Sequence, residues 1–83
     1  MVRHDKITAY ELRKQVRKGD IRLGGNARLK IYGQLRCASG RRMKRENRVF
    51  FKNETEAQKY GYRPCGHCMT GAYRQWKKGD IGL

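Results

Sequence analysis

The residues whose types and spacing favour a definite chemistry are the three cysteines of this 83-residue chain. Cys65 and Cys68 form a C-x-x-C pair, and Cys37 lies well upstream beside a basic stretch. A C-x-x-C turn brings two thiolates toward one tetrahedral ion, and a thiolate from a distant segment then cross-links the chain. An odd number of cysteines argues against a simple disulfide framework. We therefore predict a zinc site held by Cys37, Cys65 and Cys68.

A redox role for the C-x-x-C pair is the main alternative to zinc. Thioredoxin-like pairs follow a strand in a βαβ unit, and this chain is too short and too differently patterned to contain one. The fourth zinc ligand is open. His67 is nearest in sequence, although side chains inside a C-x-x-C turn usually point away from the metal, and His4 would have to fold back from the start of the chain. Water or an outside ligand would leave an open coordination position, as in catalytic zinc sites.

The size of the chain also favours a metal. A single domain of 83 residues lies in the range where one hydrophobic core gives marginal stability, and only 37% of its residues are apolar. We expect residues 1–83 to form one domain. The residues expected in its core are Leu12, Val16, Leu29, Ile31, Val49, Phe50, Phe51, Tyr60, Tyr73 and Trp76.

The charge of the chain points to a polyanionic partner. Its 21 Lys and Arg residues against seven acids give a net charge of +14. Solubility alone is normally reached with a net charge magnitude of about 2–8 in a small domain, whereas a larger positive field attracts nucleic acid. The sequence has no signal-peptide-like hydrophobic run and no apolar stretch of membrane-spanning length. We expect a cytoplasmic monomer whose thiols stay reduced.

The elements that must position the cysteines can be predicted in outline. Thr8 and Glu11 form a capping-box pattern, so a helix should begin there and end at Gly19. The Gly-Gly-Asn run at residues 24–26 predicts a break in the chain, and the alternation over residues 29–32 predicts a short strand reaching Gly33. The basic, small-residue-rich segment after Cys37 predicts a loop.

The second half of the chain carries clearer signals. The strongest strand pattern is Arg48–Phe51, and Asn53 is a favourable N-cap for a short helix that reaches Tyr60. Met69, Tyr73 and Trp76 follow at helical spacing and predict a last helix ending near residue 79. The pattern indicates an α+β fold, a small zinc-stabilised domain with a short sheet flanked by helices.

Four segments resemble one known family in order and spacing. They carry a Gly-aromatic-Arg-Pro-Cys-x-x-Cys motif and a Glu-Asn pair before an aromatic strand, and they are Lys30–Cys37, Arg45–Phe51, Thr55–Ala57 and Gly61–Cys68. This part of the chain, residues 29–68, resembles the zinc-binding N-terminal domain of the Ada methylphosphotriester repair and regulatory proteins. The resemblance implies a zinc-stabilised α+β module that binds DNA, in a stand-alone form without the helix-turn-helix and alkylguanine-repair domains of full-length Ada proteins.

One position departs from the pattern of that family. The family places two cysteines four residues apart after an Ile-aromatic pair, the first as methyl acceptor and the second as a ligand. Aligned on Ile31 and Tyr32, this chain has Gly33 at the acceptor position and Cys37 at the ligand position. Glycine cannot be alkylated, so the resemblance implies the metal scaffold without the acceptor and favours a chain with no catalytic residue.

The predicted function is therefore a non-catalytic, zinc- and DNA-binding module linked to DNA repair or transcriptional regulation. Two alternatives are an alkyl-transfer protein that uses Cys37 as its acceptor and an RNA-associated zinc protein. The candidate zinc ligands are Cys37, Cys65, Cys68 and, as the fourth, His67. The candidate nucleic-acid contacts are the cations of the basic segment and the arginine next to the metal motif, namely Arg41, Arg42, Lys44, Arg45, Arg48 and Arg63.

Overall fold

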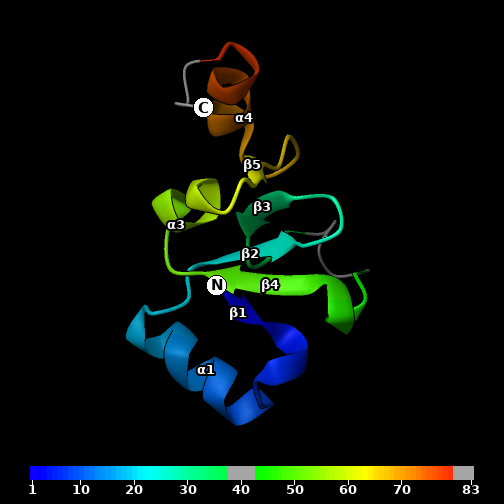
Figure 1. The fold of residues 1–83 in the computed structure, drawn as a ribbon. Helices are drawn as coiled ribbons and strands as arrows, with labels where there is room; N and C mark the ends of the chain where they lie inside the picture. The colour runs from blue at the N-terminus through cyan, green and yellow to red at the C-terminus, as the bar shows by residue number, and fades with distance from the viewer. Residues whose placement is uncertain (38–42, 80–83) are drawn as a thin grey trace.

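A five-stranded sheet forms the centre of the computed structural model, which describes residues 1–37 and 43–79 (Figure 1). Its strand order is β1-β4-β2-β3-β5, and the pairs are antiparallel except β3 with β5, which is parallel. The strands are β1 (Val2–Arg3), β2 (Leu23–Asn26), β3 (Ile31–Gln34), β4 (Arg48–Phe51) and β5 (Arg63–Pro64). The helices of the described residues are α1 (Ala9–Lys18), α3 (Glu54–Lys59) and α4 (Thr70–Lys77), with 3-10 turns η1 (His4–Lys6) and η2 (Arg45–Asn47). The predicted α+β class is confirmed.

The first two helices begin and end at the predicted caps. The Thr8 hydroxyl oxygen accepts a hydrogen bond from the Glu11 amide at 3.1 Å, and α1 ends at Gly19, which takes the left-handed conformation with φ of 82°. The Asn53 side-chain oxygen accepts from the Glu56 amide at 2.9 Å at the start of α3. These local bonds satisfy amides that a helix end would otherwise leave unpaired. The strand predicted over Arg48–Phe51 is β4.

The predicted chain break at Gly24-Gly25-Asn26 is wrong, because these residues belong to β2, which pairs with both β3 and β4. Glycine is needed there for packing. A Cβ built on Gly25 would lie 2.8 Å from an atom of the Phe51 ring and 3.0 Å from the Ile31 carbonyl oxygen. The missing side chain therefore makes room for the Phe51 ring over the sheet. The predicted strand at residues 29–33 is displaced, since β3 spans Ile31–Gln34.

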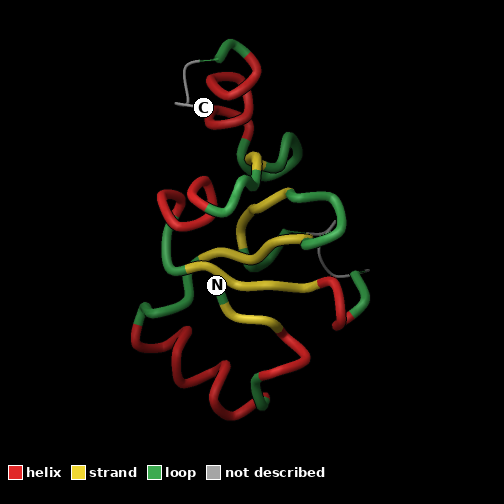
Figure 2. Tube along the Cα trace, viewed as in Figure 1, coloured by secondary structure: helices red, strands yellow, loops and turns green. Residues whose placement is uncertain are grey.

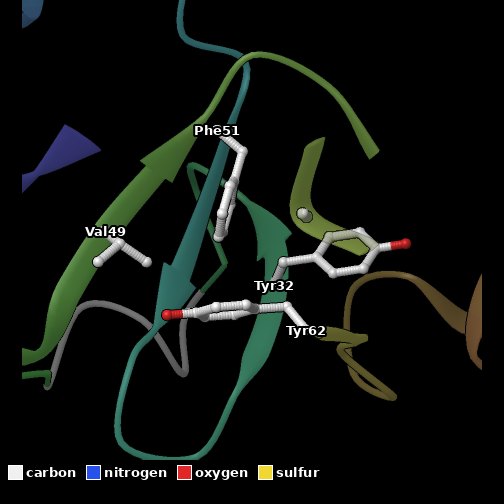
Figure 3. Close-up of a cluster of buried hydrophobic side chains, with 5 residues drawn as sticks. Tyr32, Val49, Phe51 and Tyr62 are labelled. Atoms are coloured by element: carbon white, nitrogen blue, oxygen red, sulfur yellow. The ribbon is translucent and has the colours of Figure 1, made fainter. Parts of the chain in front are cut away.

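The hydrophobic core joins the middle of the sheet to α3 and to the segment that leads into β5 (Figure 3). Its buried members are Tyr32, Val49, Phe51, Ala57 and Tyr62. The Phe51 and Tyr62 rings meet edge to face with centroids 4.8 Å apart. Burial raises the pKa of both the Tyr32 and the Tyr62 hydroxyl. This cluster fixes β3 and the chain just before Cys65 against the same core.

The predicted core was partly wrong. Leu29, Tyr60 and Val16 are 60%, 49% and 40% exposed, because Leu29 lies in the turn before β3 and the other two lie on open helix faces or ends. Ile21 and Tyr62, which the periodicity did not mark, are 2% and 4% exposed. Periodicity within one element cannot reveal these two residues, which are buried by neighbouring elements.

The molecule is elongated, with principal extents of 39, 24 and 18 Å. In Figures 1 and 2, α1 lies beyond the β1 edge of the sheet and α4 lies beyond the β5 edge, at the opposite end. The cysteine-bearing turn lies between β5 and α4. In the part of the chain that the structure describes, no helix has the length and apolar character to cross a membrane.

Candidate metal centre

The parallel pairing of β3 with β5 brings the two cysteine-bearing segments together. Tyr32 is the register partner of Pro64, and the Cys65 amide donates to the Tyr32 carbonyl at 2.7 Å. The same register places Gly33 beside Cys65, so that a Cβ on Gly33 would lie 3.1 Å from the Cys65 Cβ. The fold thus brings the segment that leads to Cys37 next to the C-x-x-C turn, as the predicted zinc site requires.

Cys37 joins this pair through a tight turn at the end of β3. Its amide donates to the Gln34 carbonyl at 3.1 Å, and the residue is 9% exposed. The Cys37 and Cys65 sulfurs are 4.0 Å apart, and the three sulfurs, with Cys68, all lie within 4.8 Å of one another. A tetrahedral zinc ion with Zn–S bonds of about 2.3 Å requires sulfurs roughly 3.8 Å apart. The three thiols therefore fit a zinc ion, with small side-chain rotations at most.

Backbone amides already point at two of these sulfurs. The Gln34 amide donates to the Cys68 sulfur at 3.3 Å, and the His67 amide donates to the Cys65 sulfur at 3.4 Å. Amide donors of this kind stabilise thiolates. Without a cation, burial raises the pKa of the Cys68 thiol to about 12, the Gln34 amide lowers it, and the neighbouring cysteines raise it further. A divalent cation would supply the missing positive charge and displace the protons.

The structure brings no fourth protein ligand to the three sulfurs within residues 1–37 and 43–79, where the cysteines alone form a group that could hold a metal. His67 is exposed, and its backbone amide contacts the cluster. His4 packs its ring edge to face on Phe50 with centroids 5.3 Å apart. Burial, then Arg45 and Arg48, lower the pKa of His4. A ligand role for His67 stays a prediction.

Gly33 is in direct contact with the cluster. A Cβ at this position would lie 2.6 Å from the Cys68 sulfur, closer than real Cβ contacts allow. Among the glycines that the structure describes, those with positive φ are Gly19, Gly61 and Gly79, and Gly33 is not one of them. Glycine at this position therefore leaves room for the cysteine side chains, and the backbone conformation does not require it.

A cavity of about 320 Å³ opens on one side of the cluster. Its lining includes Gly33, Cys37, Cys65 and His67, and its apolar members include Ile31, Tyr32 and Met43. Two of the predicted nucleic-acid residues, Arg48 and Arg63, also line it. Cys37 and Cys65 thus face a space large enough for a small molecule, whereas Cys68 does not line it.

The predicted nucleic-acid residues fall into three groups. Arg41 and Arg42 lie outside the described residues. Lys44 and Arg45 are exposed at η2, where the Arg45 Nε donates to the His4 carbonyl at 3.4 Å. Arg48 and Arg63 are half-buried and lie on strands β4 and β5.

The two strand arginines are held by aromatic rings. The Arg48 guanidinium lies 5.4 Å from the Phe50 ring centroid and donates to the Leu35 carbonyl at 3.3 Å. The Arg63 guanidinium lies 5.5 Å from the Tyr73 centroid and 5.4 Å from the Trp76 centroid. Arg63 therefore stabilises the packing of α4 on β5 in addition to any role toward a ligand.

A second groove, which the sequence-based predictions missed, lies between α1 and the sheet. It has a volume of about 470 Å³. Its lining consists of four arginines, Arg13, Arg17, Arg36 and Arg48, and four apolar residues, Leu12, Val16, Leu35 and Phe50. Arg13 and Arg17 are four residues apart and so share a helix face. That spacing was the available signal, but the contribution of Arg36 and Arg48 depends on the tertiary fold. Arg48 lines this groove and the cysteine cavity alike.

Few of these positive charges are neutralised internally. In residues 1–37 and 43–79, Arg3 is the one Lys or Arg side chain within ion-pair distance of a carboxylate, 3.2 Å from Asp5. The positive field predicted from the composition is therefore available to a partner.

Comparison with known proteins agrees with this geometry. A protein-family profile described as the metal binding domain of Ada matches residues 8–70, which is most of the chain. No curated protein and no solved structure matches it. The matched region contains all three clustered cysteines, and the family together with the cluster identifies zinc as the cofactor. The chain belongs to the family of Ada-type metal-binding domains.

Proposed function

We propose that this protein is a zinc-dependent, non-catalytic DNA-binding module that serves DNA repair or transcriptional regulation, as a cytoplasmic monomer. Membership of the Ada-type family favours association with nucleic acid in general. The observation that most directly supports DNA binding is the position of Arg48, which lines both the cavity at the cysteines and the arginine groove beside α1. A duplex backbone that spans the cavity and the groove would meet arginines from four separate segments, namely α1, the residue Arg36 after β3, β4 and β5.

The charge of the metal centre supports the same proposal. Zinc with four thiolates carries a net charge of −2, and zinc with three carries −1 when its fourth ligand is neutral. With Gly33 at the acceptor position, this chain has three clustered thiols. The centre thus has the lower negative charge without methylation, so the module would need no methyl switch to bind DNA.

Alkyl transfer to Cys37 is the alternative that the cavity favours. Cys37 lines the cavity but is 9% exposed. In methyl transfer, the Cys37 sulfur would attack the methyl carbon of a methylphosphotriester and the phosphodiester anion would leave, so the methyl group would have to reach the sulfur through that opening. Exposure of the zinc protein to a duplex with methylphosphotriesters, followed by peptide mass spectrometry, tests this directly. A methyl group on Cys37 would establish transfer and overturn the non-catalytic proposal.

The DNA proposal is tested by fluorescence anisotropy with a labelled duplex over a range of salt concentrations. We expect tight binding at low salt, and neutralisation of Arg41, Arg42, Lys44 and Arg45 together should weaken it. Each phosphate that is left without its cation should remove about 0.9 from the slope of log K against log salt. A structured RNA of equal charge serves as competitor. If the RNA displaces the duplex at much lower concentration, an RNA-associated function replaces this one.

A further inference from the structure

Among the described residues, the cysteine cluster offers three sulfur ligands, and Gly33 lies in direct contact with it. The described residues bring three sulfurs together and no histidine or carboxylate joins them. The lining of the cavity includes Gly33, His67 and two of the three clustered cysteines, Cys37 and Cys65. A zinc ion among these sulfurs takes four ligands in its preferred geometry. No fourth ligand atom of the described residues lies in this group, and the cavity gives an outside ligand access to Cys37 and Cys65.

The walls of the cavity define the chemistry of that ligand. Leu29, Ile31 and Met43 make one part apolar, and Arg48 and Arg63 add two guanidinium groups. A ligand that fits combines a soft donor atom for zinc, a short apolar stem and a negative charge. The volume of about 320 Å³ lies at the small end of the range for small-molecule sites, about 300–1,000 Å³.

We propose that Gly33 opens the zinc centre to a small anionic thiol, which enters the cavity and provides the fourth sulfur ligand. The thiol loses its proton to solvent as its sulfur binds, and its anionic group lies toward Arg48 and Arg63. In this way an outside molecule supplies the ligand that an acceptor cysteine at position 33 would supply. The fourth thiolate raises the negative charge of the centre by one unit, so the bound thiol opposes the binding of a polyanion.

Cobalt(II) in place of zinc makes the ligand visible, because thiolate-to-cobalt charge-transfer absorption grows with the number of sulfur ligands. The wild-type protein loaded with cobalt is titrated with thioglycolate, and ultrafiltration confirms that the metal stays with the protein. We expect the charge-transfer absorption to rise by about one third at saturation, as three sulfurs become four. An unchanged spectrum across the titration overturns the proposal, since the fourth position is then already filled or closed.

Gly33→Cys is the matched variant, because it places a sulfur at the opening. It should show the four-sulfur spectrum without added thiol and no response to thioglycolate. His67→Ala tests the competing ligand within the chain and should respond as the wild type does. If the thiol response appears only after His67→Ala, then His67 is the fourth ligand and the proposal is wrong.

The arginines are tested with a charge series of thiols: thioglycolate, 2-mercaptoethanol and cysteamine. We expect affinity to fall in that order, and Arg48→Gln should reduce the ratio of thioglycolate to cysteamine affinity several-fold. Because each ratio compares the same two thiols, their own acidities cancel between variant and wild type. An unchanged ratio removes Arg48 from the site, and affinities that do not fall in this order overturn the preference for an anion. The inference needs zinc but not DNA binding, so failure in the duplex titration and failure in the thiol titration are separate results.

Discussion

At position 33, the choice between glycine and cysteine affects both space and charge around the metal. A Cβ there lies 2.6 Å from the Cys68 sulfur, so any larger residue must displace that sulfur. Cysteine offsets the displacement with a fourth ligand, whereas alanine has no donor. The pair of variants Gly33→Cys and Gly33→Ala therefore separates the steric effect from the effect of ligation.

For Gly33→Cys, we expect tighter zinc binding and weaker DNA binding at low salt. The added unit of negative charge near a phosphate should cost on the order of 1 kcal/mol, the scale for one partly screened charge. For Gly33→Ala, we expect weaker zinc binding than in the wild type. Competition with a chromophoric chelator measures zinc affinity, and duplex anisotropy measures DNA binding. Equal DNA binding by the four-sulfur variant at every salt concentration would contradict the charge argument.

The thiols should make zinc affinity strongly dependent on pH. Burial raises the pKa of Cys68 to about 12, so this thiol holds its proton at neutral pH when no metal is bound. Zinc binding must release that proton, and the affinity should rise with pH by about one logarithmic unit per pH unit for each proton displaced. In the metal-free protein the sign is opposite: the raised pKa favours folding below the pKa of the unfolded thiol, and this stabilisation is lost as pH rises toward about 12. Chelator competition at several pH values, with calorimetric proton counting, checks the first trend; a pH-independent affinity would contradict it.

The spacing of the cysteines predicted the type of metal site, but it did not predict the fourth ligand of the metal. The C-x-x-C pair and the upstream Cys37 meet as predicted, and Gly33 lies against them as its alignment implied. The fourth ligand could not be read from the sequence. A histidine inside a C-x-x-C turn has ligand chemistry, but the direction of its ring depends on turn geometry that residue types do not determine.

Among the elements, α4 depends on Arg63 for its position. The guanidinium of Arg63 contacts the rings of Tyr73 and Trp76. These two rings are stacked with their centroids 5.8 Å apart. Arg63→Ala should lower stability by about 0.5–1 kcal/mol and expose Trp76 further. Trp76 is the single tryptophan of the chain, so its emission should shift to the red. Arg74→Ala, on an exposed position of the same helix, is the control. Identical emission in both variants would show that α4 is held by other contacts.

Variants of α1 can separate the role of the arginine groove in duplex binding from the effect of overall charge. Arg13→Gln with Arg17→Gln should weaken duplex binding and reduce the salt slope by about 0.9 for each phosphate that is no longer neutralised. Lys14→Gln with Lys18→Gln removes the same charge from the same helix at exposed positions that do not line the groove. We expect this control to change the slope less. Equal effects of the two double variants would mean that overall charge, rather than the groove, determines binding.

The elements were predictable wherever a local signal specified them. Caps at Thr8 and Asn53 marked the starts of α1 and α3, and an apolar run marked β4. The strand β2 was missed because Gly24 and Gly25 have low strand propensity, and the approach of the Phe51 ring, which explains the glycine at position 25, depends on the tertiary fold. The parallel partner β5 has two residues and no pattern of its own. Its place is set by pairing with β3, which local sequence patterns cannot reveal.

For the molecule as a whole, the cysteine cluster lies outside the main hydrophobic core. The core cluster joins β3, β4 and α3, whereas α4 lies beyond β5 at one end of an elongated body. The three cysteines link the end of β3 to the turn between β5 and α4. Zinc binding at such a link contributes directly to folding, because the unfolded chain offers no preformed site. Loss of zinc should therefore unfold the chain, beginning with α4 and the β3–β5 pair.

The most direct test of this account is metal analysis of the purified protein, combined with amide NMR spectra before and after chelation. We predict one zinc per monomer, loss of dispersed resonances on chelation and their return when zinc is restored. Cys65→Ser and Cys68→Ser should resemble the chelated protein. A metal-free protein whose dispersed resonances are unchanged by chelator and by added zinc would contradict the central claim that Cys37, Cys65 and Cys68 hold a structural zinc ion.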